Sequence, residues 1–330
     1  MNSEFRQDLV SGDWIVIAPR RLERPRELSK KHIKRVRTPV SKCPFEYPEK
    51  SGHGKPILIY PARKNWQVQV VSNKYPALIH KKACASLFKN GPYSVMDGRG
   101  YHELVITRNH NKNFAKLNQE EAGLVFRAFQ ERYRTFNDDH CLAYVSIFHN
   151  WGPNAGASVY HPHYQIIAIP VLPPDISHSL EGSGRYFQKY GKCVHCAMLQ
   201  WEKKERKRVL YENKGAIVIA PFVSREPFEL RIFPKRHLPY FEDADPKDLG
   251  FTVEALQKSL QLIEKYLGDP DYNFFIHTAP LKNKNKYRHY HWHIEILPKL
   301  SISAGFELGT GIEITVVDPD EAVKVLKGKS

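Results

Sequence analysis

Two short segments of the chain share one pattern: two histidines separated by a single residue, with a polar residue two positions later. Residues 161–165 read HPHYQ, and residues 291–295 read HWHIE. Isoleucines surround or follow both segments, and a proline closes each apolar run, which predicts a β-strand. Alternate side chains of a strand point to the same face. We therefore expect the two histidines and the fifth residue of each segment to lie together on one face.

Each HxH segment ends a longer repeat. In the first half, an apolar strand from residue 102 leads to His110, a helix is expected at about 119–136, and a strand follows at 142–148. In the second half, a strand at 228–233 leads to His237, a helix is expected at 246–267, and a strand follows at 272–277. The lone histidine precedes the HxH pair by 51 residues in one half and by 54 in the other. This similarity predicts a duplicated α+β unit.

The composition is that of a globular protein with room for one large or two moderate domains. The chain has 330 residues, of which 42% are hydrophobic and 26% charged. No apolar run approaches the roughly 20 residues that span a membrane, so no membrane partner is expected. The first residues show no apolar signal segment, and we therefore expect a cytoplasmic protein.

The chain is strongly basic, with a formal net charge of +15. A basic protein favours anionic partners such as nucleotides, sugar phosphates or nucleic acid. Much of the charge lies in two runs, at residues 30–37 and 203–208, which are typical of solvated loops. Neither run has the interleaved aromatic residues of a nucleic-acid motif, so nucleic acid is not the expected partner.

The five cysteines are an odd number in a chain without an apparent signal segment, which argues against a disulfide framework. Cys193 and Cys196 form a CxxC motif that lacks a thioredoxin-like context, and a metal knuckle completed by histidines fits it better. Cys84 and Cys141 are expected to be plain small hydrophobic residues.

Several motifs together resemble the galactose-1-phosphate uridylyltransferase family of the histidine-triad superfamily. They lie at residues 14–25 (WIVIAPRRLERP), 73–77 (NKYPA), 156–165 (GASVYHPHYQ) and in the second HxH strand. The chain is also similar to the ADP-glucose phosphorylase branch, which shares the GFExGTG ending at residues 305–311 and the CxxC motif. The resemblance implies an α+β fold of two fused histidine-triad-like units, each with an antiparallel-rich sheet and packed helices. The expected units are residues 1–180, with the nucleophile, and residues 181–330, with a structural metal site.

The resemblance also implies a nucleotidyltransferase that works through a covalent nucleotidyl-histidine. His163 matches the nucleophile, and Gln165 on the same strand face is expected to donate a hydrogen bond to a phosphoryl oxygen. The residues expected to bind the nucleotide and its phosphates are Arg21, Arg24, Asn73, Asn154, Gly156, Ala157, Ser158, Gly305 and Phe306.

Two structural zinc sites follow from the same resemblance. The first would use Cys43, Glu46, His110 and His161, with Glu46 in the place of a family thiol. Zinc could bind there through the carboxylate, or the site could be weak or empty. The second would use Cys193, Cys196, His237 and His291. An alternative second set combines His277, His291 and His293 with an upstream carboxylate such as Glu181.

The reaction expected first is the exchange of UMP between UDP-glucose and galactose 1-phosphate. An ADP-sugar phosphorylase, with ADP-glucose as donor and inorganic phosphate as acceptor, is the second interpretation. A nucleotide-binding or RNA-binding protein without catalysis is the third, and the combination of His163 with Gln165 argues against it. The resemblance is compatible with a homodimer.

Overall fold

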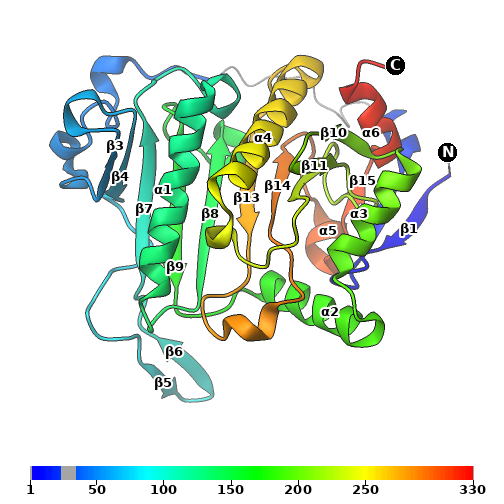
Figure 1. Cartoon of the computed structure of the whole chain (residues 1–330), viewed down its shortest axis with the longest axis horizontal. Helices are drawn as coiled ribbons and strands as arrows, with labels where there is room; N and C mark the ends of the chain where they lie inside the picture. The colour runs from blue at the N-terminus through cyan, green and yellow to red at the C-terminus, as the bar shows by residue number, and fades with distance from the viewer. Residues whose placement is uncertain (1, 24–34, 330) are drawn as a thin grey trace.

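A ten-stranded antiparallel sheet forms the centre of the molecule (Figure 1). The computed structural model describes residues 2–23 and 35–329, so Arg24 lies outside the described residues. From one edge to the other, the strands are β10 (Val209–Glu212), β11 (Ala216–Ile219), β12 (Leu230–Pro234), β14 (His293–Pro298), β13 (Tyr272–His277), β8 (Tyr144–Trp151), β9 (His163–Ile169), β7 (Tyr101–Thr107), β4 (Val68–Ser72) and β3 (Leu58–Tyr60).

The sequence repeat appears as a repeat in the order of the strands. Strands β13 and β8 pair at the centre, in antiparallel register from Tyr272↔Trp151 to Ile276↔Ile147. Outward from this seam, β14, β12 and β11 on one side correspond to β9, β7 and β4 on the other. The expected α+β class is confirmed, but the two units share one sheet instead of forming one each. The division at residue 180 falls inside helix α2 (Pro174–Tyr190) and stays a prediction.

Two long helices cover one face of the sheet, one from each unit (Figure 1). They are α1 (Gln119–Asn137) and α4 (Pro246–Leu267), which confirms both expected helices. The Asn118 side chain caps α1 by accepting a hydrogen bond from the Glu121 amide at 2.8 Å. The Glu121 carboxylate in turn accepts from the Asn118 amide at 2.9 Å, which completes a reciprocal capping box. Asp245 caps α4 ahead of a proline at the first helical position.

A single apolar core fills the space between these helices and the sheet. It includes Phe126 and Phe129 of α1, Tyr164 of β9 and Phe274 of β13, all of them fully buried. Burying each such side chain contributes about 2–3 kcal/mol before the cost in conformational entropy. Because residues of both halves belong to this core, the two units are packed as one body.

The HxH strands differ from the expectation at their starts. β9 begins at His163 and β14 at His293, so the first histidine of each pair, His161 or His291, precedes its strand. His161 and His163 nevertheless both contact the ring of Phe45, with ring centroids 5.9 and 4.8 Å apart. The two histidines therefore stay together, but the first is held by the preceding loop.

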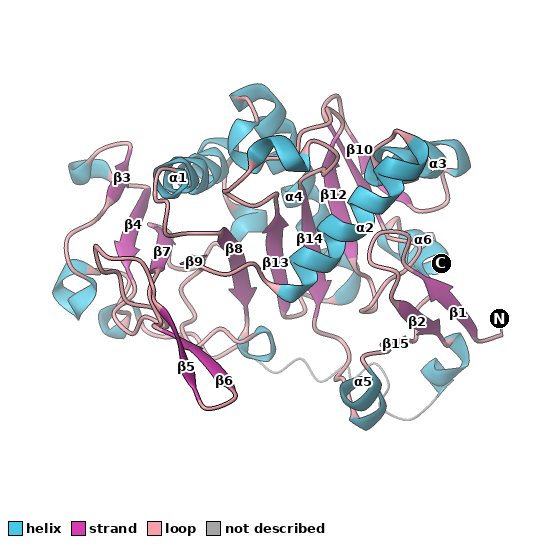
Figure 2. Ribbon diagram, turned by 90° about the horizontal axis from the view of Figure 1, so that it is seen from below, coloured by secondary structure: helices cyan, strands magenta, loops and turns pink. Residues whose placement is uncertain are grey.

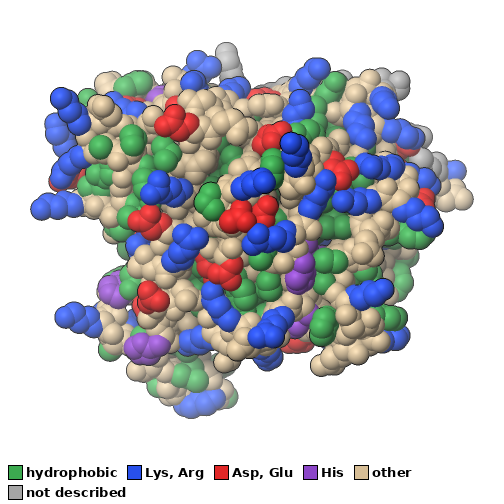
Figure 3. All heavy atoms as spheres, in the orientation of Figure 1, with side chains coloured by type: hydrophobic (Ala, Val, Ile, Leu, Met, Phe, Trp, Pro, Cys, Tyr) green, Lys and Arg blue, Asp and Glu red, His purple; other side chains and the backbone are tan. Residues whose placement is uncertain are grey.

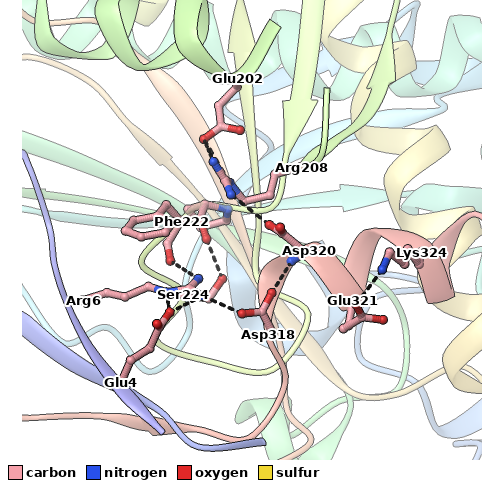
Figure 4. Close-up of polar contacts among 11 residues, drawn as sticks. Glu4, Arg6, Glu202, Arg208, Phe222, Ser224, Asp318, Asp320, Glu321 and Lys324 are labelled. Carbon is pink, nitrogen blue, oxygen red and sulfur yellow. Dashed lines mark hydrogen bonds and ion pairs between the residues drawn. The ribbon is translucent and has the colours of Figure 1, made fainter. Parts of the chain in front are cut away.

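A second, three-stranded sheet lies beside the second unit. It consists of β1 (Glu4–Gln7), β2 (Trp14–Ile17) and β15 (Ile314–Thr315). Arg6 of β1 donates to Asp318 at 2.5 Å and to the Phe222 carbonyl at 2.9 Å, which ties both ends of the chain to the second unit (Figure 4). Arg208 pairs with Glu202 and Asp320 in the same network (Figure 4).

The other elements are shorter. They are the helices α3 (Val194–Glu205), α5 (Gly305–Thr310) and α6 (Pro319–Leu326), the hairpin of β5 (Leu87–Asn90) and β6 (Tyr93–Met96), and the single turns η1 (Pro19–Glu23), η2 (Val40–Lys42), η3 (Glu49–His53), η4 (Arg63–Asn65), η5 (Phe114–Lys116), η6 (Pro153–Ala155), η7 (Phe241–Asp243) and η8 (Lys284–Tyr287). The β5–β6 hairpin projects from the body of the molecule in both ribbon views (Figures 1 and 2).

Cys84 and Cys141 form a disulfide, which corrects the expectation that they are unpaired small residues. They are 57 positions apart in sequence, but the fold brings their Cα atoms to 5.0 Å. Ile79, before the hairpin, pairs with Arg99, which leads into β7, and the hydroxyl of Tyr101 on that strand donates to Asp139 at 3.1 Å. An odd cysteine count argues against a full framework but leaves room for one such pair.

The basic charge is spread over the surface that Figure 3 shows. Lys and Arg side chains are scattered across the visible face, with Asp and Glu side chains between them (Figure 3). No single basic patch dominates this face. Among the described residues, no helix combines the length and the apolar character that crossing a membrane requires.

Candidate functional site

His163 lies at the start of β9, the strand between β8 and β7 in the first unit's half of the sheet. Its side chain is 7% exposed, and the ring of Phe45 covers it. Strand β9 is hydrogen-bonded to β8 on one side and to β7 on the other, so the backbone at His163 is fixed from both sides. The carbonyl of His163 also accepts a bond from the buried ring of His149, at 2.8 Å from its Nδ1.

The hydrogen bonds of the His163 ring determine which nitrogen can react. Its Nδ1 lies 2.9 Å from the carbonyl oxygen of His161. A carbonyl only accepts, so Nδ1 carries the proton and Nε2 keeps its lone pair. Burial holds the pKa of His163 below its usual value, which keeps the ring neutral near pH 7. A neutral imidazole with its Nε2 held in this way is a competent nucleophile.

Gln165, the expected partner of His163, is linked to a residue that sequence reasoning missed. The Oε1 of Gln165 lies 2.9 Å from the Nε2 of His102 on β7, and the Nδ2 of Asn73 lies 3.0 Å from the same nitrogen. The structure thus brings Asn73, Gln165 and His163 to one face of neighbouring strands. His102 could have been found from its position in a predicted strand next to the NKYPA motif.

The loop between β8 and β9 is held in place mainly by its own backbone. Gly152 and Gly156 adopt φ angles of 86° and 87°, which glycine reaches without strain. The amide of Ala157 donates to Gly152, and the amide of Gly156 donates to Pro153 within the loop. These two amides are therefore already paired within the loop. The binding roles expected of Gly156 and Ala157 stay predictions. The exposed side chains of Asn154 and Ser158 are the polar groups that this loop presents to solvent.

Three other expected nucleotide-binding residues lie far from His163 in the same chain. Arg21 belongs to η1 after β2, and Gly305 and Phe306 begin α5. Both segments flank the three-stranded sheet, which packs on the second unit through Val223. In Figures 1 and 2, α5 and β15 lie toward the β10–β12 end of the structure, away from β9. The structure therefore does not bring these residues to His163 within one chain.

The first expected metal group is assembled and buried. One potential ligand atom from each of Cys43, Glu46, His110 and His161 lies within 4.8 Å of all the others. The Nδ1 atoms of His110 and His161 lie 3.0 and 3.4 Å from the Glu46 carboxylate. Their Nε2 atoms lie 2.8 and 2.7 Å from the carbonyls of Thr38 and Thr107.

Those carbonyls place the ring protons on Nε2, so both Nδ1 lone pairs point into the group. Burial lowers the pKa of His161 to about 4, which favours the neutral form that binds metal. Arg108 lies 3.3 Å from the second oxygen of Glu46. The donor set thus fits a divalent cation, although Arg108 would compete with that cation for the Glu46 carboxylate.

The second expected metal group repeats this arrangement. Cys193, Cys196, His237 and His291 also converge within 4.8 Å. The Sγ of Cys196 lies 3.4 and 3.6 Å from the Nδ1 atoms of the two histidines. The Nε2 atoms of these histidines lie 2.8 and 3.0 Å from the carbonyls of Arg288 and Pro234.

A hydrogen bond from the Cys193 thiol lowers the pKa of Cys196 and favours its thiolate. Two sulfurs and two imidazoles with inward lone pairs are the ligands that zinc prefers in tetrahedral structural sites. The second group therefore fits zinc better than the first, in which a carboxylate replaces one sulfur.

The alternative second set is not assembled. Glu181 lies on helix α2 and accepts from Ser177 at 3.1 Å, and His291 belongs to the Cys₂His₂ group. His277 and His293 instead converge with Glu295. Arg225 pairs with this carboxylate, and Arg231 approaches it at 3.4 Å. Two guanidinium groups already neutralise Glu295, which disfavours a cation there.

Two family models match the chain. The model for the galactose-1-phosphate uridyl transferase N-terminal domain matches residues 1–173, and the model described as scavenger mRNA decapping enzyme C-term binding matches residues 192–303. Fold, paired units and histidine site together define the class of the protein as a nucleotidyltransferase enzyme. More particularly, the chain belongs to the galactose-1-phosphate uridylyltransferase family.

Relatives of two kinds cover nearly the whole chain. An ADP-glucose phosphorylase from Arabidopsis thaliana is 33% identical, over 98% of this chain and 92% of its own. A galactose-1-phosphate uridylyltransferase from Thermotoga maritima is 26% identical, over 98% of both chains. The crystal structure of an Arabidopsis thaliana ADP-glucose phosphorylase with bound ADP-glucose gives a TM-score of 0.84 at 31% identity over 100% of both chains. A uridylyltransferase structure gives 0.76 at 27% identity, over 99% of this chain and 98% of the other.

Proposed function

We propose that the protein transfers a nucleoside monophosphate from a nucleotide sugar to a phosphate acceptor through a nucleotidyl group on His163. The observation that carries this proposal is the state of the ring. It is buried and neutral, and its Nδ1 proton is held by the His161 carbonyl, so Nε2 is left to react. Gln165 follows two residues later on the same strand.

The proposed reaction has two displacements at the α-phosphorus. The Nε2 of His163 attacks this phosphorus, a P–N bond forms, and the P–O bond to the sugar 1-phosphate breaks. An oxygen of the acceptor phosphate then attacks the same phosphorus and breaks the P–N bond, which frees His163. Gln165 would donate an N–H to a phosphoryl oxygen as charge develops. Each step exchanges one bond to phosphorus for another and needs no redox partner.

ADP-glucose as donor and inorganic phosphate as acceptor are the substrates that we favour. The sequence placed UMP exchange first, but the phosphorylase relative is more similar than the uridylyltransferase relative, at 33% against 26% identity. The TM-scores, 0.84 against 0.76, point the same way. UMP exchange between UDP-glucose and galactose 1-phosphate is the second candidate, supported by the family model over residues 1–173.

A homodimer is part of this proposal. Arg21 and Phe306 match family positions that contact the nucleotide sugar, yet their segments lie away from β9 in one chain. A second copy could bring them to His163, together with Gly305. Arg24 would act with Arg21 on phosphate oxygens. Asn73, Asn154 and Ser158 would bind from the chain that carries His163. A cytoplasmic location also stays a proposal.

Zinc is the metal that we propose for both Cys/His groups. Cys193, Cys196, His237 and His291 would hold it more firmly than Cys43, Glu46, His110 and His161. Zinc at either place would be structural, because it fixes loops and strand ends. The first group includes His161, whose carbonyl orients the His163 ring. No step of the proposed reaction passes through the metal.

A product assay tests this function. The protein is incubated with ADP-glucose or UDP-glucose, each with inorganic phosphate or galactose 1-phosphate, and the released glucose 1-phosphate is measured. We expect release from ADP-glucose with phosphate, and His163→Ala should lower it by about three orders of magnitude or more. The exposed His178 provides a control, since His178→Ala should keep the wild-type rate. Release that His163→Ala leaves intact would contradict the proposal.

A further inference from the structure

We propose that His102 is a positioning residue that sets the orientation of the Gln165 side-chain amide. This inference rests on the proposed function, because it assigns to Gln165 a bond to the phosphoryl group. His102 lies on β7, the strand between β9, which carries Gln165, and β4, which Asn73 follows. The backbone fixes the relation of these strands, since Leu104 pairs with Gln165 and the Asn73 amide donates to the His102 carbonyl at 2.9 Å.

The amide of Ala77 determines where the proton of His102 lies. This backbone N–H donates to the Nδ1 of His102 at 3.1 Å. A backbone amide can only donate, so Nδ1 must be the acceptor and carry no proton. The neutral ring then has its proton on Nε2. The loop of residues 73–77 therefore selects one tautomer of His102.

The Nε2–H of His102 points to one acceptor, the Oε1 of Gln165 at 2.9 Å. When the carbonyl end of the Gln165 amide is held by His102, its NH₂ end is turned the other way. That NH₂ group is the end that can donate to a phosphoryl oxygen. Without His102, the amide could rotate and present a carbonyl oxygen to the phosphate, and the two oxygens would repel each other.

Asn73 completes the chain of contacts on the nucleotide side. The Tyr75 amide donates to the Oδ1 of Asn73 at 3.0 Å, which places the NH₂ group of Asn73 toward His102. Because Nε2 of His102 already bears a proton, it cannot accept from this NH₂ group, and the 3.0 Å approach of these two donors favours turning the NH₂ group toward another acceptor. The side-chain NH₂ group of Asn73 can therefore donate to an acceptor on the nucleotide. His102 thus connects the loop that would bind the nucleotide with Gln165, the residue that would act at phosphorus.

The experiment measures nucleotidylation of His163 in single turnovers with ADP-glucose. His102→Phe keeps an aromatic ring but removes both hydrogen bonds. We expect the rate of nucleotidylation in this variant to fall about 10- to 100-fold, a smaller loss than that from removing a group that donates directly to the transition state. The half-saturating ADP-glucose concentration should change less than about threefold. His102→Gln can place a donor near the position of Nε2 and should recover most of the rate. His178→Phe, an exposed substitution on α2, should behave as wild type.

A double variant tests whether His102 acts through Gln165. On a Gln165→Ala background, His102→Phe should cost less than about twofold, because the amide that it orients is gone. Equal losses on both backgrounds, or a wild-type rate for His102→Phe, would overturn the proposal. Nitrogen-15 NMR spectra of the His102 ring show which ring nitrogen carries the proton, independently of turnover. A protonated Nδ1 would overturn it, even if the wild type forms no adduct and the proposed function itself fails.

Discussion

At the level of single residues, backbone carbonyls determine which ring nitrogen each histidine of the candidate sites presents to its site. His110, His161, His237 and His291 direct Nε2 to a carbonyl, so that Nδ1 faces a cysteine or a carboxylate. His163 directs Nδ1 to a carbonyl, so that Nε2 is left to react. Under the proposed function, one residue type would therefore serve both metal binding and phosphoryl chemistry, and the hydrogen-bond partner would decide which.

Glu46 gives the first residue-level prediction. Glu46→Cys converts its group into a second Cys₂His₂ set, and a thiolate is a better zinc ligand than a carboxylate that also pairs with Arg108. We expect zinc affinity at this site to rise by about tenfold or more, measured by competition with a chromophoric chelator. Glu49→Cys, at an exposed position nearby, is the control and should leave the affinity unchanged. Equal affinities for Glu46→Cys and wild type would contradict the role given to Glu46.

His149 gives a prediction about pH. Burial lowers the pKa of His149 to about 3 in the folded protein, below the value of about 6.5 expected in the unfolded chain. As pH falls below 6.5, the unfolded chain gains a proton that the folded chain cannot take, so stability falls down to about pH 3. By pH 5 this one group costs the wild type about 2 kcal/mol.

His149→Phe removes this titration and also the bond to the His163 carbonyl. We expect the variant to be less stable than wild type by about 1 kcal/mol at pH 7.5, and the difference to shrink or reverse at pH 5. Urea unfolding at the two pH values measures it. A difference that stays constant between pH 7.5 and 5 would show that His149 does not titrate as its burial implies.

At the level of elements, the CxxC knuckle joins three parts of the second unit. Cys193 is the N-cap of α3, Cys196 lies in the first turn of that helix, and His237 and His291 come from the loops after β12 and before β14. A metal at this place would link a helix to two strand ends that are distant in sequence. Its binding free energy would then contribute to the stability of the fold.

The double variant Cys193→Ser, Cys196→Ser tests this link. We expect it to lose about one zinc ion per chain and to melt at least several degrees lower than wild type, since structural zinc contributes directly to folding. Metal content is measured by mass spectrometry, and melting by calorimetry. The Ser177→Ala variant, at a partly exposed position on α2, serves as the control for handling. Unchanged zinc content and melting temperature would rule the site out.

At the level of the whole molecule, the seam between β8 and β13 makes the two units one body. It places backbone hydrogen bonds between the halves, and the main apolar core includes residues of both. A separate fragment of residues 1–180 would expose the β8 edge and part of this core. We expect such a fragment to remain unfolded or to aggregate, and the full chain to unfold in one cooperative transition, by circular dichroism. A fragment with native-like dispersion in its NMR spectrum would contradict this coupling.

The sequence was enough for features that depend on local pattern. The helices at 119–136 and 246–267 follow from apolar periodicity, and the residues of the two metal groups follow from the resemblance to the family. The single sheet, the Cys84–Cys141 disulfide and the link from His102 to Gln165 depend on pairings between distant segments, which periodicity does not report. The distance of α5 from β9 belongs to the same class, because only the tertiary fold places the ends of the chain.

The most direct test of the proposed reaction is the covalent adduct on His163. The protein is mixed with ADP-glucose without any acceptor, and the intact mass and the modified peptide are measured within the first turnover. We predict the mass gain of one adenylyl group, located on His163, with one glucose 1-phosphate released per adduct, and loss of the adduct when inorganic phosphate is added. Absence of any nucleotidyl adduct from both ADP-glucose and UDP-glucose, or an adduct on a residue other than His163, would contradict it.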